Sequence, residues 1–250
     1  MGKDCGCSIT DHDHRHEHHH HHHHQNPELG NRKTVEVLTK ILDANDRQAE
    51  SNREHFEEHG VLAINLMSSP GAGKTTLLEK TIELLGEELK VGVIEGDLET
   101  SRDAERIKAK GAPAYQITTG QACHLDAFMV HEGIHNLPLD ELDLVFIENV
   151  GNLVCPASYD VGAHVNVVLL STTEGDDKPE KYPVMFRSAE LMLITKIDLL
   201  PYMDFDLERA VRSAKNVNPR LDIIKLSSKT NEGFDLWLEF VKSKRKLRVL

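Results

Sequence analysis

The sequence lacks both the long apolar runs of a membrane protein and the short apolar segment of a secretory signal. No uncharged apolar stretch in its 250 residues approaches the roughly 18 residues that a membrane-spanning helix needs. The first residues, MGKDCGC, contain no apolar segment either. We therefore expect neither a signal peptide nor a membrane span.

Basic residues are also in deficit. The chain has 29 Lys and Arg against 41 Asp and Glu, which gives a formal net charge of −12. A protein held on nucleic acid by phosphate contacts, or docked on anionic lipid, needs an excess of basic surface. Neither nucleic acid nor a membrane surface is therefore expected as a partner.

Cysteine is scarce, whereas histidine is abundant. The four cysteines are too few for a disulfide scaffold, and the plainest interpretation is four reduced cytosolic thiols. Of the 16 histidines, 10 lie between His12 and His24. Because protonation of every imidazole would move the formal charge from −12 to +4, charge and metal affinity should depend strongly on pH.

Composition divides the chain into three parts. Residues 1–30 form a polar, Cys/His-rich arm that we expect to be disordered without metal, since it has little apolar surface to bury. Its His run is mixed with Asp, Glu and Arg, which favours a native segment over a purification tag. Residues 31–60 predict a helical lead-in with Gly60 at its end, and residues 61–250 the main domain.

The main domain alternates short apolar runs with amphipathic stretches. Continuous, β-branched runs are typical of strands buried on both faces, so we predict a mainly parallel α/β sheet flanked by helices. The expected strands are Val61–Met67, Val91–Glu95, Ala114–Thr118, Leu142–Ile147, Val165–Ser171, Leu191–Thr195 and Ile223–Leu226. The expected helices are Lys74–Glu88, Ser101–Lys110, Cys123–His131, Leu207–Asn216 and Phe234–Lys246.

A phosphate-binding P-loop follows the first expected strand. The string SSPGAGKTT lies between a strand and an amphipathic helix, with Ser68 where the usual motif begins with Gly. Small residues allow backbone N–H groups to turn toward a phosphate, and the helix N-terminus adds a positive dipole end. We expect Lys74 to reach the β- and γ-phosphates, Thr75 to bind Mg²⁺ and Thr76 to contact the α-phosphate. The rest of the cradle is Gly71, Ala72 and Gly73.

A second motif predicts the base. The string TKID, at the end of an expected strand, resembles the guanine-reading NKxD motif of GTPases, with Thr195 in place of Asn. The Asp198 carboxylate can accept from both N–H groups on the guanine edge, which adenine lacks, so it disfavours adenine nucleotides. The stem of Lys196 would cover one face of the base. After the last strand, Ser227, Ser228 and Lys229 resemble the loop that lies over guanine O6.

Two acidic strand ends are expected near the phosphates. The string ENVG resembles the DxxG motif of GTPases, so Glu148 would orient Mg²⁺ through water and Gly151 would offer its N–H to the γ-phosphate. Asp97 would join the Mg²⁺ shell or orient the attacking water. Its alternative role is to cap the helix that follows.

Cys123, His124 and Cys155 form a candidate metal site. A lone cysteine is more often a small buried apolar residue, but Cys155 lies four residues, at most about 14 Å, beyond Gly151. Movement of Gly151 therefore cannot be remote from this thiol. Thiolate and imidazole ligands suit Zn²⁺ or Ni²⁺. Since one chain offers three such ligands and closed sites usually want four, a symmetric dimer would complete the site at its interface.

The arm offers further metal ligands. Cys5 and Cys7, with the terminal amine, could chelate one ion, although a solvated tail is the plain alternative. The His run predicts a binder of low affinity and high capacity. Imidazoles alone do not select Ni²⁺ over Cu²⁺ or Zn²⁺.

Together these strings resemble the HypB family of hydrogenase nickel-incorporation GTPases. The resemblance spans residues 32–250 and rests on SPGAGKTT, EGDLET with DAERI, the Cys123–His124 pair, ENVGNLVCP and TKIDL. The family's longer CxxCGC terminus is reduced here to CGC, at Cys5 and Cys7.

The resemblance implies a cytosolic nickel metallochaperone that hydrolyses GTP slowly and dimerises around it. Its expected partners are a HypA-type nickel/zinc accessory protein and the large subunit of a [NiFe]-hydrogenase. It implies that Cys123, His124 and Cys155 bind the metal. Residues that serve GTP and Mg²⁺ are Lys74, Thr75, Asp97, Glu148, Lys196 and Asp198, and those expected in catalysis are Lys74, Asp97, Glu148 and Gly151.

Two alternatives stay open from the sequence. One is a urease accessory GTPase, although that family's Cys-Pro-His motif differs from the directly adjacent Cys123 and His124. The other is a nickel store in which the His arm is the main functional element.

Overall fold

The computed structural model describes residues 32–86, 88–97 and 102–248, so Cys5, Cys7 and the His run lie outside the described residues. The chain divides into a first unit ending at Val37 and a second unit from Leu38 onward. Of the first unit, the described part is the beginning of α1 (Arg32–Glu58). The second unit contains the sheet and the candidate site.

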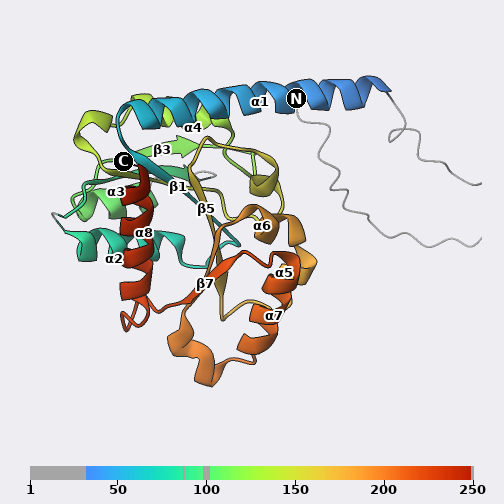
Figure 1. The fold of residues 1–250 in the computed structure, drawn as a ribbon, viewed down its shortest axis with the longest axis vertical. Coiled ribbons are helices and arrows are strands. Elements are labelled where there is room, and N and C mark those ends of the chain that lie inside the picture. The colour runs from blue at the N-terminus through green and yellow to red at the C-terminus, as the bar shows by residue number, and fades with distance from the viewer. Residues whose placement is uncertain (1–31, 87, 98–101, 249–250) are drawn as a thin grey trace, which may run out of the picture. The chain divides into compact units, whose positions relative to one another are not determined.

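A parallel sheet forms the centre of this unit (Figure 1). In the described residues it has seven strands in the order β3-β2-β4-β1-β5-β6-β7, and every neighbouring pair is parallel. This confirms the predicted α/β class. The strands are β1 (Leu62–Ser68), β2 (Val91–Asp97), β3 (Ala114–Thr118), β4 (Leu144–Glu148), β5 (Val165–Ser171), β6 (Leu191–Thr195) and β7 (Asp222–Lys225).

Helices cover both faces of the sheet because successive strand residues point to opposite sides. Leu62, Ile64 and Leu66 of β1 pack in one cluster with apolar residues of α2, α3 and α8. Ala63 and Met67 face the other way, toward clusters that hold Phe56 of α1 together with residues of α4, α6 and α7. These helices are α2 (Lys74–Leu85), α3 (Arg102–Ala109), α4 (Ala127–His135), α6 (Pro183–Ser188), α7 (Leu207–Val217) and α8 (Phe234–Arg248).

Most helix boundaries differ from the prediction by no more than two residues, whereas α4 ends four residues later, at His135, and two other boundaries have a clear physical reason. Helix α2 ends at Leu85, before Glu88, because Gly86 takes a positive φ of 54° and its N–H closes the last turn. Helix α4 begins at Ala127 instead of Cys123, because the Asp126 side chain caps it by accepting from the Met129 N–H. Cys123 and His124 therefore lie on a turn before the helix.

Several short elements are absent from the prediction. They are α5 (Lys178–Lys181), α6, and 3₁₀ turns at Leu139–Glu141, Cys155–Ser158 and Ile197–Tyr202. Each is too short for a hydrophobic period to reveal it. The turn that begins at Cys155 holds this thiol on a bend after β4.

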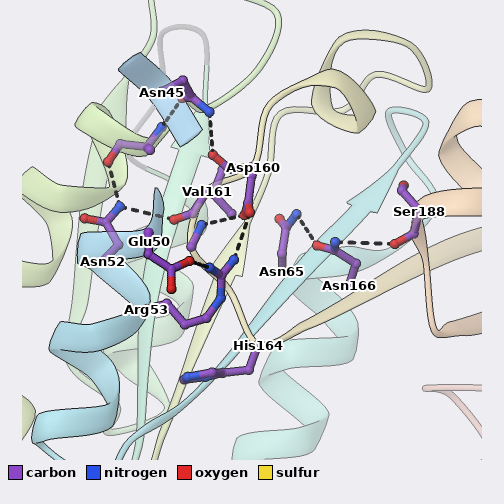
Figure 2. A network of polar contacts seen from close by, with 12 residues as sticks. Asn45, Glu50, Asn52, Arg53, Asn65, Asp160, Val161, His164, Asn166 and Ser188 are labelled. Carbon is purple, nitrogen blue, oxygen red and sulfur yellow. Dashed lines mark hydrogen bonds and ion pairs between the residues drawn. The ribbon is translucent and has the colours of Figure 1, made fainter. Parts of the chain in front are cut away.

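Side-chain amides attach the second half of α1 to the rest of the unit (Figure 2). Asn45 donates to the Asp160 carbonyl, and Asn52 donates to the carbonyls of Ala127 and Val161. Asn45 and Asn52 are buried, so each of these bonds satisfies a group that water cannot reach.

Among the described residues, no helix is both long and apolar enough to cross a bilayer.

Candidate functional site

A polar crevice lies at the carboxyl ends of the central strands. Strand β1 pairs with β4 on one side and β5 on the other, and ligands bind to open α/β sheets where the strand order diverges in this way. A cavity of about 450 Å³ opens here. It is lined by the P-loop, the ends of β2 and β4, and Asp103, Arg106, Asn149, Val150, Gly151 and Lys196.

The P-loop has the geometry of an anion cradle. Gly71 and Gly73 take positive φ values of 75° and 97°, which residues with side chains rarely adopt. Helix α2 begins at Lys74, so its N-terminus meets the cavity. Lys74 Nζ donates to Ser68 Oγ at 3.1 Å, and the Ser68 hydroxyl donates to the Ser69 carbonyl at 2.7 Å. Ser68, the departure from the usual motif, therefore holds the lysine against the loop.

Buried acidic groups lie beside the P-loop. The Thr75 hydroxyl donates to Glu148 Oε1 at 2.9 Å, and carboxylate oxygens of Glu95, Asp103 and Glu148 lie within 4.8 Å of one another. One oxygen each of Glu95 and Glu148, Oε2, is buried without a hydrogen-bond partner among the residues the structure describes. Burial, reinforced by the charge of Glu148, raises the pKa of Glu95. Burial also raises the pKa of Glu148, against the opposing charge of Lys74.

These carboxyls fit Mg²⁺, which prefers oxygen ligands and would satisfy the unpaired oxygens. The sequence analysis did not single out Glu95, because it stands in an apolar run that predicts a strand. The signal that could have identified it is a carboxylate within a strand that is expected to be buried. Asp97 lines the same cavity. Helix α3 is described from Arg102 onward, and residues 98–101 lie outside the described part of the chain.

A smaller cavity of about 260 Å³ adjoins the P-loop on the side of β6, lined by Ala72, Gly73, Thr76, Thr195, Lys196, Asp198, Leu199, Ser228 and Lys229. The TKID string forms its wall and also supports the P-loop. The Thr195 hydroxyl donates to the Ala72 carbonyl at 2.8 Å, and Lys196 Nζ donates to the Gly71 carbonyl at 2.7 Å.

A hydrogen bond from Ser227 holds the Asp198 carboxylate in place. The Ser227 hydroxyl donates to Asp198 Oδ1 at 2.6 Å, and Ser227 Oγ accepts from the N–H groups of Lys229 and Thr230. Ser227 is fully buried, so it orients the carboxylate, while Ser228 and Lys229 line the cavity.

Gly151 touches the P-loop. A Cβ added there would lie 2.8 Å from Pro70 Cα and 2.9 Å from Pro70 N, so this close approach requires glycine. The segment after β4 is therefore packed against the phosphate cradle at Gly151.

Cys123, His124 and Cys155 come together as predicted from the sequence. Their ligand atoms lie within 4.8 Å of one another, and the two sulfur atoms are 2.7 Å apart. All three residues are half-buried, and both cysteines are free thiols. The His124 ring stacks on Tyr159 at 3.9 Å, and burial lowers the pKa of His124, which favours the neutral imidazole that binds metal. Tyr159 carried no signal in the sequence.

Asn149 connects this Cys/His cluster to the cavity beside the P-loop. This buried side chain accepts hydrogen bonds from the N–H groups of Leu125 and Val150, both at 3.0 Å. Its amide also donates to Asn65 of β1 at 3.3 Å. One residue thus joins the loop after Cys123 and His124 to the segment that carries Gly151 and Cys155. In the sequence, Asn149 is part of the ENVG string and carries no separate signal of this role.

Comparison with known proteins identifies the architecture. The family described as "CobW/HypB/UreG, nucleotide-binding domain" matches residues 62–225. The hydrogenase maturation factor HypB of Escherichia coli K12 is 50% identical over 88% of this chain and 76% of its own length. A Helicobacter hepaticus relative named hydrogenase/urease maturation factor HypB is 47% identical over 88% of this chain and 91% of its own length.

Solved structures agree. HypB from Helicobacter pylori in complex with nickel gives a TM-score of 0.78 at 42% identity, over 81% of this chain and 95% of that one. HypB from Archaeoglobus fulgidus gives a TM-score of 0.77 at 43% identity, over 82% of this chain and 100% of that one. The chain therefore belongs to the HypB hydrogenase maturation factors, within the CobW/HypB/UreG family of nucleotide-binding GTPases.

Proposed function

We propose that this GTPase is a nickel metallochaperone, in which the state of the bound nucleotide controls a Cys/His nickel site. The cargo is a nickel ion destined for the large subunit of a [NiFe]-hydrogenase. The nickel-bound relative and the name of the maturation factors support this assignment.

For the nucleotide, we assign the phosphates to the larger cavity and the guanine to the smaller one. Lys74 contacts the β- and γ-phosphates, and Gly71, Ala72 and Gly73 cradle them with backbone N–H groups. Thr76 contacts the α-phosphate. Asp198 reads the guanine edge between Lys196 and the Ser228–Lys229 loop. The positive φ of both P-loop glycines and the rigid support of Asp198 by Ser227 favour these roles.

For hydrolysis, Mg²⁺ would be held by the Thr75 hydroxyl together with Glu148 and Glu95. When bound, the ion supplies positive charge that stabilises the departing phosphate oxygens. Asp97 orients the attacking water, and the Gly151 N–H contacts the γ-phosphate. The buried, unpaired Oε2 atoms of Glu95 and Glu148 are the feature that favours a divalent cation at this place.

The coupling of GTP to nickel rests on one observation. The segment from Asn149 to Cys155 packs against the P-loop at Gly151 and ends 2.7 Å from the other thiol of the metal cluster. A shift of this segment on γ-phosphate contact would move Cys155 relative to Cys123 and His124. A change of about 1 Å is large for a metal site, whose ligand distances vary by about 0.2 Å.

The proposal extends to partners. A GTP-dependent homodimer would bring two three-ligand clusters together and complete the coordination of the ion. Zn²⁺ would fit the same thiolate and imidazole donors. A HypA-type nickel/zinc protein would exchange metal with the cluster, and the protein would act in the cytoplasm. The arm with Cys5, Cys7 and the His run would supply additional nickel.

The test compares nickel binding at the cysteine cluster in two nucleotide states. Nickel–thiolate charge-transfer absorption is titrated in the full chain with GDP and with a non-hydrolysable GTP analogue, and oligomeric size is measured in parallel. The double variant Cys123→Ser/Cys155→Ser is the control: it removes both thiolates of this cluster, so that any absorption left comes from Cys5 and Cys7. We expect the two nucleotides to give different affinities and different sizes. Equal values for both would rule out the switch.

Urease is a second candidate recipient, because the relative from Helicobacter hepaticus is named for both hydrogenase and urease. Complementation separates the two. A maturation-deficient host that regains hydrogenase but not urease activity supports the hydrogenase assignment, and the reverse contradicts it.

A further inference from the structure

Four histidines form a cluster on the surface where α1 meets α4, in addition to the cysteine cluster. His55 lies in the last turn of α1, and His59 lies just after the end of that helix. His131 and His135 lie one turn apart on α4. The rings of the two pairs meet: His55 is 4.8 Å from His59 and 5.2 Å from His135, and His131 is 4.4 Å from His135, between ring centroids.

The α4 pair already has the spacing of two ligands on one ion. The Nε2 atoms of His131 and His135 are 3.1 Å apart. Two nitrogens bound to one ion at about 2.1 Å are separated by about 3.0 Å at a right angle and about 3.4 Å at the tetrahedral angle. The observed distance falls between these two values.

Asn52 fixes the tautomer of His131. Its Nδ2 donates to the carbonyls of Ala127 and Val161 at 2.7 and 3.2 Å, so its Oδ1 is the end that faces His131 (Figure 2 shows Asn52 and Val161). Because Oδ1 only accepts, the proton sits on His131 Nδ1, 3.0 Å away, and neutral His131 presents the Nε2 lone pair to His135. A hydrogen bond from the second ring nitrogen is the usual device that orients a ligating histidine.

His59 is oriented in the same way. Its Nδ1 lies 2.9 Å from the His55 carbonyl, which only accepts, so Nε2 of the neutral ring carries the lone pair. That Nε2 lies 3.5 Å from Asp140 Oδ1, a further oxygen donor. His55 joins the two pairs through its ring contacts.

Two of the four rings, His55 and His131, have lowered pKa values, which reduces the competition of protons with a metal ion. Burial, followed by the charges of His59 and His135, lowers the pKa of His55, against the opposing charge of Glu58. Burial and His135 lower the pKa of His131. Four imidazoles without a thiolate suit Ni²⁺, Zn²⁺ or Cu²⁺ and do not suit Mg²⁺.

From this geometry we propose that His55, His59, His131 and His135 form a second binding site for a first-row divalent cation. His131 and His135 are the primary ligands, and Asn52 is a positioning residue. In the described residues no three of these histidines bring ligand nitrogens within 4.8 Å of one another, so His55 and His59 must rotate from their present orientations to complete the site. Along α4, His131 and His135 lie about 6 and 12 Å beyond Ala127, where the helix begins after the Cys123–His124 turn. The inference does not depend on GTP hydrolysis or on nickel delivery.

The test uses the full chain carrying Cys123→Ser and Cys155→Ser, which removes the cysteine cluster and so separates this proposal from the previous one. Imidazoles are acylated with diethyl pyrocarbonate, with and without Ni²⁺ or Zn²⁺, and each histidine-containing peptide is quantified by mass spectrometry. This readout distinguishes the four residues from the arm. At an ion concentration about ten times the dissociation constant, modification of His131 and His135 should slow about elevenfold, because only the free fraction reacts.

His135→Gln is the diagnostic variant, since it removes one ligand from an exposed position. It should abolish the protection of His131. Glu54→Gln, an exposed change on the neighbouring turn of α1, should leave the protection intact. Two results would overturn the proposal: equal modification rates of His131 with and without metal, or full protection of His131 in His135→Gln. Thermal unfolding of each variant confirms that the native fold is present.

Discussion

Substitution of Gly151 by alanine tests the contact between the segment from Asn149 to Cys155 and the P-loop. The added Cβ would lie 2.8 Å from Pro70 Cα, whereas carbon atoms prefer about 3.5 Å, so one partner must move by about 0.7 Å. The P-loop is the fixed partner, because Thr195 and Lys196 hold the Ala72 and Gly71 carbonyls. The segment that carries Gly151 must therefore move away.

The magnitude follows from the cost of overpacking, which is about 1–3 kcal/mol. The part of this cost that falls on the triphosphate-bound state, in which the segment must stay close to the P-loop, weakens binding. A cost of about 1–2 kcal/mol in that state corresponds to roughly five- to thirtyfold weaker binding of a GTP analogue. GDP affinity should change little, because GDP has no γ-phosphate for this segment to contact.

Equilibrium binding of fluorescent GDP and of a non-hydrolysable GTP analogue measures the ratio of the two affinities. Gly92→Ala is the matched control: its Cβ would lie 2.5 Å from Leu142 Cδ1, but Gly92 is at the start of β2, away from the cavity. It should lower the free energy of unfolding and leave the ratio unchanged. If Gly151→Ala keeps the wild-type ratio, the assigned contact is wrong.

Three further predictions concern the nucleotide site. Thr195→Val removes a buried hydroxyl and leaves the Ala72 carbonyl unpaired, so we expect urea unfolding to show a loss of about 1–3 kcal/mol, with Thr195→Ser near wild type. Asp198→Asn should reduce the preference for GTP over ATP in a competition assay by about tenfold or more, and an unchanged preference would refute its assignment to guanine. The raised pKa of Glu95 means that the metal-free folded state binds more protons than the unfolded state above the ordinary carboxyl pKa, so stability should fall as pH rises. Glu95→Gln should remove the part of this dependence that Glu95 contributes, up to about 1.4 kcal/mol per pH unit between about pH 5 and pH 8, whereas a wild-type slope in the variant would contradict it.

Local sequence patterns predicted the sheet because its strands are buried on both faces and read as continuous apolar runs. They predicted the P-loop and the TKID string because each is a contiguous motif. The cysteine cluster was predicted because Cys123 precedes His124, because Cys155 lies four residues beyond Gly151, and because the family resemblance implies these ligands. Short elements such as α6 and the turn at Cys155 have no period to detect.

The residues that sequence reasoning missed act through contacts between distant segments. Asn149 reaches Leu125, Tyr159 stacks on His124, and Asn52 orients His131. Glu95 was hidden in an apolar strand, and the two pairs of surface histidines lie at least 72 residues apart in the sequence, from His59 to His131. Such partners become visible when the fold brings their elements together.

Reciprocal linkage between nickel and the γ-phosphate is the central claim, and one pair of titrations tests it. The affinity for the GTP analogue is measured with and without nickel, in the full chain and in Gly151→Ala. Nickel should change the affinity for the GTP analogue by about five- to 150-fold in the native chain, and by much less in Gly151→Ala. The same affinity with and without nickel in the native chain would contradict the claim.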